Sequence, residues 1–282
     1  MQNTTREETM AIKKVGVIGL GKMGGPLARH LRGAGFEVTG YDVAKAAVDA
    51  VADAGVKAAA DCAEIGASCD LAIVGVGFDS QVEETLFGEG GLMTNPRDGL
   101  IVAIASTASP QMMKDIAART TGSGVTFLDI PMCRGEHAAI AGELLIMGGG
   151  DKATFDACRP AFETFASSIY YLGDLGAGQV GKMVNNLILW ACISANTEGT
   201  RIAGALGVEA GPLREALLDS SAHNWAMDVQ ADQWPMPWAE KDMTIVLKEA
   251  DAARVSLPLC GSIKEVIKGI KIDRGEDMPR EH

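Results

Sequence analysis

A lysine and an asparagine stand one helical turn apart in a stretch that otherwise lacks charge. Every residue from 180 to 195 except Lys182 is apolar, small or uncharged polar. This pattern is typical of a buried helix, in which an unpaired ammonium is costly. Asn186 follows four residues later, so both side chains leave the same helix face. Two interpretations stay open: a lysine that transfers protons, and a lysine whose apolar stem crosses the surface while its head reaches water.

A glycine-rich turn lies near the start of the chain. The motif Gly19-Leu20-Gly21-Lys22-Met23-Gly24 follows a predicted strand, residues 15–19, and opens a predicted helix, residues 23–32. Its first two glycines permit a tight turn and a close approach to a diphosphate, and the third lets the helix pack on the strand. In this context the motif predicts a dinucleotide site. A glycine turn that binds no nucleotide is the alternative.

Asp42 ends the second predicted strand, 18 residues after Gly24. An acid at this point accepts hydrogen bonds from the adenosine ribose hydroxyls and repels a 2′-phosphate. Val43 and Ala44 supply no positive charge to offset that repulsion. We therefore predict NAD as the cofactor, with NADP less favoured. The residues expected to bind it here are Gly19, Leu20, Gly21, Lys22, Met23, Gly24 and Asp42.

A polar loop, residues 131–137, follows the strand predicted at residues 125–130. Open α/β sheets bind their ligands at such strand ends. The guanidinium of Arg134 is a bidentate donor for a carboxylate, a sulfonate or a phosphate. The alternative is a surface arginine paired with Glu136 or Glu143. Cys133 is expected to pack, and His137 to be solvated.

Two later segments carry polar side chains that could reach a substrate. Lys241 and Asp242 open a predicted amphipathic helix. An acid in a first turn is ordinary helix chemistry, whereas the functional interpretation places the Lys241 ammonium near Lys182. His223 lies between Ser221 and a tryptophan in a polar segment, which we expect to line the pocket.

Composition narrows the class of protein. The chain has 282 residues, of which 47% are hydrophobic and 22% charged, and its net charge is −12 without a basic stripe. These values are typical of a soluble globular protein and argue against nucleic-acid binding, which needs clustered Lys and Arg. Six cysteines without paired or zinc-like spacing predict reduced thiols and no metal site. Without a signal region or a run that could span a bilayer, a cytoplasmic protein is expected.

Strands and helices alternate through the first part of the chain. Strands are expected at residues 15–19, 36–41, 71–76, 100–105, 125–130, 144–147 and 169–171, and helices at 23–32, 44–54, 80–86, 109–119 and 152–165. This alternation predicts βαβ units in an α/β fold, a Rossmann-type doubly wound parallel sheet with both faces covered.

The pattern changes after the glycine-rich residues 173–178. Only helices are expected beyond them, at residues 177–206, 212–219, 239–253 and 258–268. The predicted organisation is therefore a disordered tail (residues 1–12), an NAD-binding domain (13–174) and an all-helical domain for substrate binding and oligomerisation (175–282) that begins with a long interdomain helix.

The motifs, taken in order, resemble those of the β-hydroxyacid dehydrogenase family, which includes 3-hydroxyisobutyrate dehydrogenases and tartronate semialdehyde reductases. Residues 19–24 match its cofactor motif, and residues 87–92 and 106–110 match two further stretches of its nucleotide domain. The segment 129–144 is similar to its substrate loop, 176–186 to its catalytic stretch and 241–243 to its K-D-L motif. The resemblance covers residues 13–277.

The resemblance implies an NAD-dependent oxidoreductase that interconverts a small anionic hydroxy acid, similar to 3-hydroxyisobutyrate, and its semialdehyde or ketone. It implies that Lys182 donates and accepts the proton and that Asn186 holds the substrate beside it. It also implies a homodimer or homotetramer. The further positions implied near cofactor or substrate are Ser106, Thr107, Lys241 and the segment Gly75-Val76-Gly77, which replaces the usual L-P of the family.

The substrate loop departs from the family pattern. Cys133 and Arg134 stand where the family has a serine and a glycine, so a hydroxyl donor is lost and a cation is gained. The sulfolactaldehyde reductase branch also carries an arginine here, which makes a sulfonated substrate anchored by Arg134 an alternative. Two further alternatives are imine reduction, whose enzymes commonly lack the lysine, and dinucleotide binding without catalysis. The remaining residues expected to contact substrate are Met132, Gly135 and His223.

Overall fold

The computed structural model describes residues 12–277. The chain divides into two compact units, the first extending to Lys182 and the second beginning at Met183. The disordered tail predicted for residues 1–12 lies outside the described residues, apart from Ile12.

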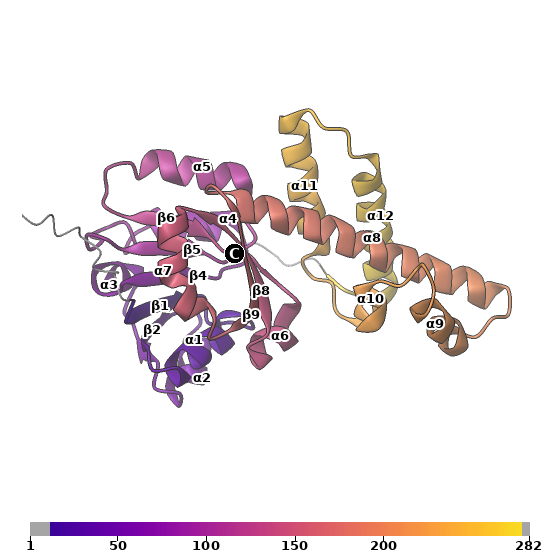
Figure 1. The fold of residues 1–282 in the computed structure, drawn as a ribbon, viewed down its shortest axis with the longest axis horizontal. Helices are drawn as coiled ribbons and strands as arrows, with labels where there is room; N and C mark the ends of the chain where they lie inside the picture. The colour runs from indigo at the N-terminus through magenta and orange to yellow at the C-terminus, as the bar shows by residue number, and fades with distance from the viewer. Residues whose placement is uncertain (1–11, 278–282) are drawn as a thin grey trace, which may run out of the picture. The chain divides into compact units, whose positions relative to one another are not determined.

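The first unit alternates strands and helices (Figure 1). Its strands are β1 (Lys14–Ile18), β2 (Glu37–Tyr41), β3 (Lys57–Ala58), β4 (Leu71–Val74), β5 (Ile101–Ile104), β6 (Thr126–Asp129), β7 (Met132–Cys133), β8 (Leu144–Gly150) and β9 (Ala166–Gly173). Its helices are α1 (Gly24–Gly33), α2 (Lys45–Ala52), α3 (Cys62–Ser68), α4 (Asp79–Phe87), α5 (Pro110–Arg119), α6 (Gly135–Ala141) and α7 (Lys152–Phe162).

One nine-stranded sheet forms the centre of this unit, in the order β3-β2-β1-β4-β5-β6-β8-β7, with β9 paired to β8. The strands from β3 to β6 along this order are all parallel. From β1 the chain first builds the sheet toward β3 on one side, and then returns to build it from β4 toward β6 on the other side. The carboxyl ends of β1 and β4 therefore border the crevice in which such sheets bind ligands. The predicted Rossmann-type sheet is confirmed over this part.

The sheet is not parallel throughout. Strand β8 runs antiparallel to β6 and β7, and parallel to β9. Only the seven-residue helix α6 and its flanking residues connect β7 to β8, and so short a connection joins antiparallel strands. The predicted parallel sheet is therefore interrupted by antiparallel pairing at this edge.

Both faces of the sheet are covered. Along β4, Leu71 and Ile73 pack into one hydrophobic core with α1, α2 and α7, whereas Ala72 and Val74 pack into a second core with α3, α4 and α5. Successive side chains of a strand point to opposite faces, so a strand buried on both faces is a continuous apolar run. This is why β4 and β5 could be recognised as short runs without polar interruption.

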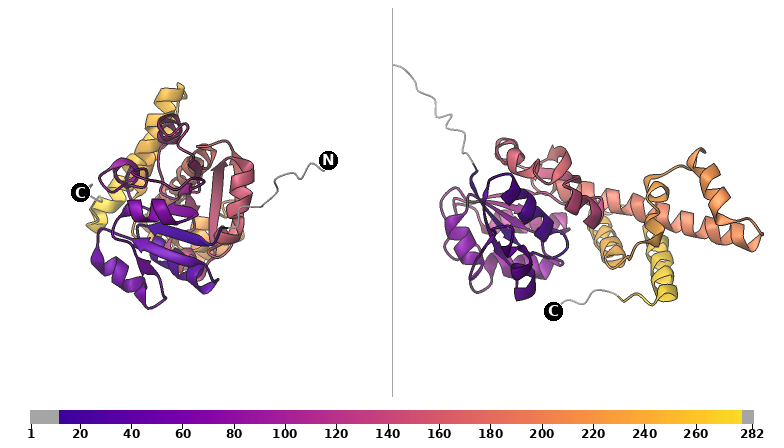
Figure 2. Two further views of the ribbon diagram at one scale, coloured as in Figure 1. Left: turned by 90° about the vertical axis from the view of Figure 1, so that its left-hand side faces the viewer. Right: turned by 90° about the horizontal axis from the view of Figure 1, so that it is seen from below.

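The second unit is helical. Its elements are α8 (Ala177–Ala205), which begins in the first unit, then α9 (Ala210–Leu218), α10 (Trp225–Asp228), the 3-10 helix η1 (Ala231–Gln233), α11 (Ala239–Ala253) and α12 (Pro258–Arg274). The core of this unit brings together Ile193 of α8, Met243 of α11 and Ile267 of α12. The right-hand view of Figure 2 shows α8 as one long helix.

Helix α8 differs from the prediction in two respects. The units divide at Lys182, within the helix, whereas the predicted boundary lies at residue 174. The expectation of a helix buried all round is wrong for the isolated chain, because Val180, Val184 and Ile188 are 46%, 50% and 58% exposed. These three side chains recur every four residues and form one apolar stripe.

All six cysteines are free thiols. Burial raises the pKa of Cys158 to about 12 and that of Cys62 to about 11, so both stay protonated at neutral pH. Within residues 12–277 no three His, Cys, Asp or Glu side chains gather as a metal site would require. No helix in the same residues has the length and hydropathy to cross a membrane.

Candidate active site

The glycine motif forms a tight turn between β1 and α1. Gly19 has a φ of +85°, and a Cβ there would lie 2.5 Å from the carbonyl oxygen of Gly75. A Cβ at Gly24 would lie 1.8 Å from the carbonyl oxygen of Gly19, so only glycine lets α1 begin this close to the turn. A Cβ at Gly21, by contrast, would have no atom within 4 Å. The open space is therefore beside Gly21, where a diphosphate would approach.

The start of α1 fits the same ligand. No side chain caps its first turn, and that turn contains no acidic residue. The backbone N–H groups at a helix start are left without helical partners and carry the positive end of the helix dipole. An anion such as a diphosphate is the group that satisfies both.

Asp42 holds this turn from the end of β2. One carboxylate oxygen, Oδ2, accepts a 2.7 Å hydrogen bond from the backbone N–H of Leu20, and Oδ1 accepts one of 2.8 Å from Ala44. The carboxylate is thereby fixed at the edge of the turn, where an adenosine ribose would lie. The next side chain, Val43, is 92% exposed and uncharged.

The ends of β4 and β5 meet the end of β1. Gly75 donates its N–H to the carbonyl of Ile18 at 2.8 Å. The hydroxyl of Ser106 accepts the N–H of Val76 at 2.9 Å and donates to the carbonyl of Val74 at 3.4 Å. Gly77 donates to the side chain of Gln81. The predicted residues of these two segments thus lie beside the glycine turn, with Thr107 partly exposed next to Ser106.

Lys182 lies at the end of the first unit and is half-buried. Its ammonium donates a 2.8 Å hydrogen bond to the carbonyl of Met132 and lies 3.8 Å from the sulfur of Cys133. Met132 and Cys133 form the two-residue strand β7, which pairs with β8. The lysine head is therefore held at the strand ends, rather than directed away into solvent.

The loop after β7 begins with Arg134 in the left-handed conformation, at a φ of +83°. Its Nη1 donates to the carbonyl of Glu143 at 2.8 Å and to the hydroxyl of Ser167 at 2.9 Å, and its Nη2 donates to Ser168 at 3.1 Å. The sequence alternative had paired this arginine with the carboxylate of Glu136 or Glu143. In the structure it donates instead to a backbone carbonyl and to two serine hydroxyls near the start of strand β9.

A salt bridge joins this loop to the glycine turn. Lys22 Nζ lies 3.1 Å from Glu136 Oε2, and both side chains are well exposed. His30 of α1 contacts the carbonyls of Ala139 and Ile140 at the end of α6. The predicted cofactor turn and the predicted substrate loop are therefore neighbours within the first unit.

In the second unit Asn186 belongs to a buried polar cluster. Its Nδ2 donates to Asp242 Oδ2 at 2.8 Å, and the same carboxylate oxygen accepts the indole N–H of Trp190 at 3.4 Å. Asn185 donates to Asn186 Oδ1 at 3.0 Å. Asn186 and Asp242 are 4% and 6% exposed. Asp242 lies in the first turn of α11, and it is in addition buried and bonded to the asparagine.

Residues 14–173 match the family model described as the NAD binding domain of 6-phosphogluconate dehydrogenase. Residues 176–279 match the one described as NAD-binding of NADP-dependent 3-hydroxyisobutyrate dehydrogenase. The chain belongs to the β-hydroxyacid dehydrogenase family.

Individual relatives agree with this membership. The NAD-dependent L-serine dehydrogenase of Pseudomonas aeruginosa is 34% identical to the present chain. The match covers 79% of the present chain and 75% of the relative. The 3-hydroxyisobutyrate dehydrogenase of the same organism is 29% identical over 87% of the present chain and 88% of the relative. The structure of a Mycobacterium tuberculosis 3-hydroxyisobutyrate dehydrogenase with L-serine is 25% identical and superimposes with a TM-score of 0.84. The superposition covers 95% of the present chain and 96% of that structure. The protein is an NAD(P)-dependent dehydrogenase.

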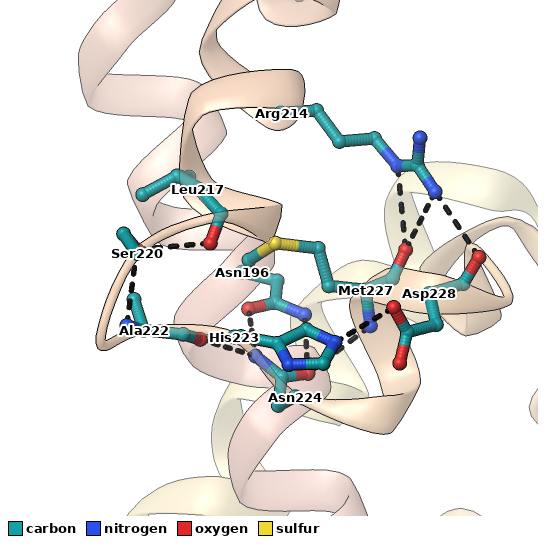
Figure 3. A network of polar contacts seen from close by, with 9 residues as sticks. All are labelled: Asn196, Arg214, Leu217, Ser220, Ala222, His223, Asn224, Met227 and Asp228. Atoms are coloured by element: carbon teal, nitrogen blue, oxygen red, sulfur yellow. Dashed lines mark hydrogen bonds and ion pairs between the residues drawn. The ribbon is translucent and has the colours of Figure 1, made fainter.

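Two predicted residues of the dehydrogenase lie in the second unit outside the Asn186 cluster. The Lys241 ammonium lies 5.3 Å above the ring of Trp238, at the start of α11. His223 Nε2 lies 2.8 Å from Asp228 Oδ1, and both side chains are about half exposed (Figure 3). Sequence reasoning gave no hint of that pair.

The His223 segment is fixed by amide pairing (Figure 3). Asn196 of α8 and Asn224 exchange two hydrogen bonds of 3.2 and 3.1 Å, and Asn224 also caps α10 by accepting the N–H of Met227. Arg214 of α9 donates to the carbonyls of Met227 and Asp228. This network holds residues 220–228 against α8 and α9.

Sequence reasoning missed the roles of two buried residues in the dehydrogenase, Asp129 and Gln179. Both are 0% exposed. One signal could have revealed the first: a carboxylate stands within the apolar run of residues 125–130, and a buried charge needs several donors. No comparable signal marks Gln179.

Proposed function

We propose that this dehydrogenase oxidises a small 3-hydroxy acid to its semialdehyde with NAD, and catalyses the reverse reduction, with Lys182 as the general acid and base. The observation that carries the proposal is the position of the Lys182 ammonium. It donates a hydrogen bond to the carbonyl of Met132, at the same edge of the sheet as the segments that lie beside the glycine turn. The names of the relatives support the substrate class. L-serine and 3-hydroxyisobutyrate are both carboxylic acids with a hydroxyl on the third carbon.

The contact of Lys182 suits proton transfer in both directions. A backbone carbonyl can only accept hydrogen bonds, so Met132 holds the lysine nitrogen whether it is charged or neutral. In oxidation the neutral amine takes the proton of the substrate hydroxyl. In reduction the ammonium returns a proton to the carbonyl oxygen. When bound, the nicotinamide supplies the hydride acceptor and donor.

Asn186 is proposed to orient the substrate hydroxyl beside Lys182. The Asp242 carboxylate accepts and does not donate, so it fixes which end of the Asn186 amide faces it. The amide nitrogen turns toward Asp242, and Oδ1 turns the other way. Oδ1 accepts one hydrogen bond from Asn185 and can accept another, so Asn186 offers a substrate one acceptor position and a second amide N–H in a set orientation.

NAD is proposed over NADP because of Asp42. The carboxylate is already engaged by Leu20 and Ala44, so its position at the ribose is set before any cofactor binds. A 2′-phosphate there would meet a fixed negative charge, and no basic side chain follows in Val43 or Ala44. The glycine turn and the uncapped start of α1 would hold the diphosphate of either cofactor.

A sulfonated substrate is not favoured. That alternative depends on the Arg134 guanidinium, whose terminal nitrogens bond to Glu143, Ser167 and Ser168. A substrate carboxylate that is bound by donors other than Arg134 leaves these three hydrogen bonds intact.

The test measures NADH formation with L-serine, 3-hydroxyisobutyrate and a 3-hydroxy sulfonate, each with NAD and with NADP. We expect turnover of a carboxylic acid with NAD and weaker turnover with NADP. Lys182→Ala should lower kcat by about 100- to 10,000-fold, the usual contribution of a general acid–base group, while NAD still binds by calorimetry. The surface variant Lys152→Ala is the matched control and should keep its kcat. Wild-type turnover in Lys182→Ala would exclude the proposed role.

A further inference from the structure

Asp129 joins the end of β6 to the start of α8. Its Oδ1 accepts the backbone N–H of Gly176 and its Oδ2 that of Gln179, each at 2.7 Å. The carboxylate has no exposure to solvent. Burial raises the pKa of Asp129, and the backbone N–H groups of Gly176 and Gln179 act in the opposite direction. Donors at the positive end of a 29-residue helix are the groups that stabilise a carboxylate at this depth.

The surroundings of this carboxylate leave no spare space. A Cβ at Gly178 would lie 2.7 Å from Asp129 Oδ2 and 2.4 Å from the carbonyl of Met147. A Cβ at Gly149 would lie 2.4 Å from Asp129 Oδ1. Helix α8 therefore packs directly on the backbone of β8, and the separation between helix and sheet is fixed by glycines on both.

Gln179 extends the connection to a second strand end. Its Nε2 donates to the carbonyl of Ser106 at 2.8 Å, and its Oε1 accepts the N–H of Ala108 at 3.1 Å. Ser106 in turn accepts the N–H of Val76 through its hydroxyl. One hydrogen-bond network thus links the segments that follow β4, β5 and β6 to the first turn of α8.

The network encloses the position of Lys182. Lys182 follows Gln179 by three positions along the helix, less than one turn. Met132 likewise follows Asp129 by three positions, and its carbonyl accepts the hydrogen bond from the Lys182 ammonium. The two paths that lead from the buried pair therefore meet at the Lys182–Met132 hydrogen bond.

We propose that Asp129 and Gln179 are positioning residues that place the Lys182 amine relative to the segments around Val76 and Ser106. The inference rests on the proposed role of Lys182. Neither residue needs to touch substrate or cofactor. Loss of either would let the first turn of α8 move against the strand ends, and a displacement of about 1 Å at a reacting group can cost up to about 100-fold in rate.

The test uses the full chain with Gln179→Met and Asp129→Asn. Methionine keeps the length of Gln179 and removes both side-chain hydrogen bonds, whereas asparagine keeps one acceptor of Asp129 and sets an amide against a backbone N–H. Gln179→Glu keeps the acceptor for Ala108 and is the conservative variant. We expect kcat to fall about 10- to 100-fold in Gln179→Met, with a smaller fall in Gln179→Glu and little change in the KM for NAD.

A second readout follows Lys182 itself. Reductive methylation with 13C-formaldehyde gives each lysine an NMR signal, and the Lys182 signal is assigned by its loss in Lys182→Ala. We expect this signal to shift in Gln179→Met and in Asp129→Asn. Asp151→Ala, which removes the N-cap of α7 in the same unit, is the matched control and should leave the signal and kcat unchanged.

Lower thermal stability with wild-type kcat and an unshifted Lys182 signal in Gln179→Met would overturn the proposal, since the pair would then be structural only. If Asp129→Asn does not fold, Gln179→Met and Gln179→Glu decide the matter. Full turnover in Lys182→Ala would remove the proposed function alone, because the NMR signal reports the placement of the lysine independently of catalysis.

Discussion

At the scale of single residues, each polar group proposed for chemistry directs one N–H at an oxygen acceptor. Met132 offers a carbonyl to Lys182, and Asp242 offers a carboxylate to Asn186. A partner that only accepts fixes the direction of one N–H. The remaining N–H groups of the same side chain stay available for a substrate. The same reasoning does not extend to Arg134, whose own donors are engaged by the protein.

Arg134 is expected to act as a scaffold for the substrate loop. Replacing it with Met removes the bonds to Glu143, Ser167 and Ser168, and should lower kcat/KM by similar factors for carboxylates and sulfonates. The double variant Ser167→Ala/Ser168→Ala removes two of the same bonds and should show a smaller loss of the same kind. Steady-state kinetics with both acids measures this. A KM increase that is confined to Arg134→Met and greatest for sulfonates would instead assign the arginine to the substrate.

At the scale of elements, Asp70 fixes where β1 begins relative to β4. Its Oδ2 accepts the N–H groups of Lys13 and Lys14 at 2.9 Å each, and Arg97 pairs with its other oxygen. Burial acts to raise the pKa of this carboxyl, but the two N–H groups and Arg97 together hold it below the usual value. A carboxyl with a lowered folded pKa stabilises the fold above its unfolded pKa of about 4 and stops doing so as pH falls through the folded value.

Asp70→Asn should therefore lower the free energy of unfolding by about 1–3 kcal/mol at neutral pH, the cost of weakened hydrogen bonds to a charged group. The difference from the wild type should begin to narrow below about pH 4, where the unfolded carboxyl binds a proton, and should be lost as pH falls through the lower pKa of the folded state. Urea unfolding at several pH values measures both. The exposed Asp115→Asn is the control, and a difference that persists unchanged at low pH would contradict the assignment to the Asp70 charge.

The elements also show how far the sequence predicts the fold. Helix α11 has the predicted bounds, 239–253, because its apolar spacing is regular. Strands β3 and β7, of two residues each, were not predicted, since they exist only through pairing with a neighbour. Helix α3 was also missed, although its start carries a readable signal: Asp61 accepts the N–H of Glu64, and Glu64 accepts that of Ala60.

The site follows the same division. Local spacing was enough to propose the glycine turn, Asp42 and the pair Lys182 and Asn186 as candidates, and the family resemblance implied the roles of the pair. The partners of Lys182 and Asn186 could not be predicted, because Met132 lies 50 residues before Lys182 and Asp242 lies 56 residues after Asn186. Bonds of that range depend on the path of the whole chain, which no local pattern contains.

At the scale of the whole molecule, the exposed face of α8 predicts self-association, as the family resemblance also implies. Val184 and Ile188 are 50% and 58% exposed on a helix whose other residues are almost all uncharged. We expect two copies to pack these stripes together, since large apolar side chains spaced one turn apart are the usual contact between helices. The net charge of −12 opposes this association, so apolar contact and not ion pairing must hold the copies together.

Two measurements by size-exclusion chromatography with light scattering test this expectation. The wild type should be a homodimer or homotetramer that persists or strengthens as salt is added, because salt screens the repulsion between like-charged copies. Val184→Asp/Ile188→Asp should shift the mass toward that of a monomer, whereas Thr200→Asp, on another side of the same helix, should not. Salt-induced dissociation of the wild type, or an unchanged mass in the double variant, would place the contact elsewhere, because neither result fits an interface built on the apolar stripe.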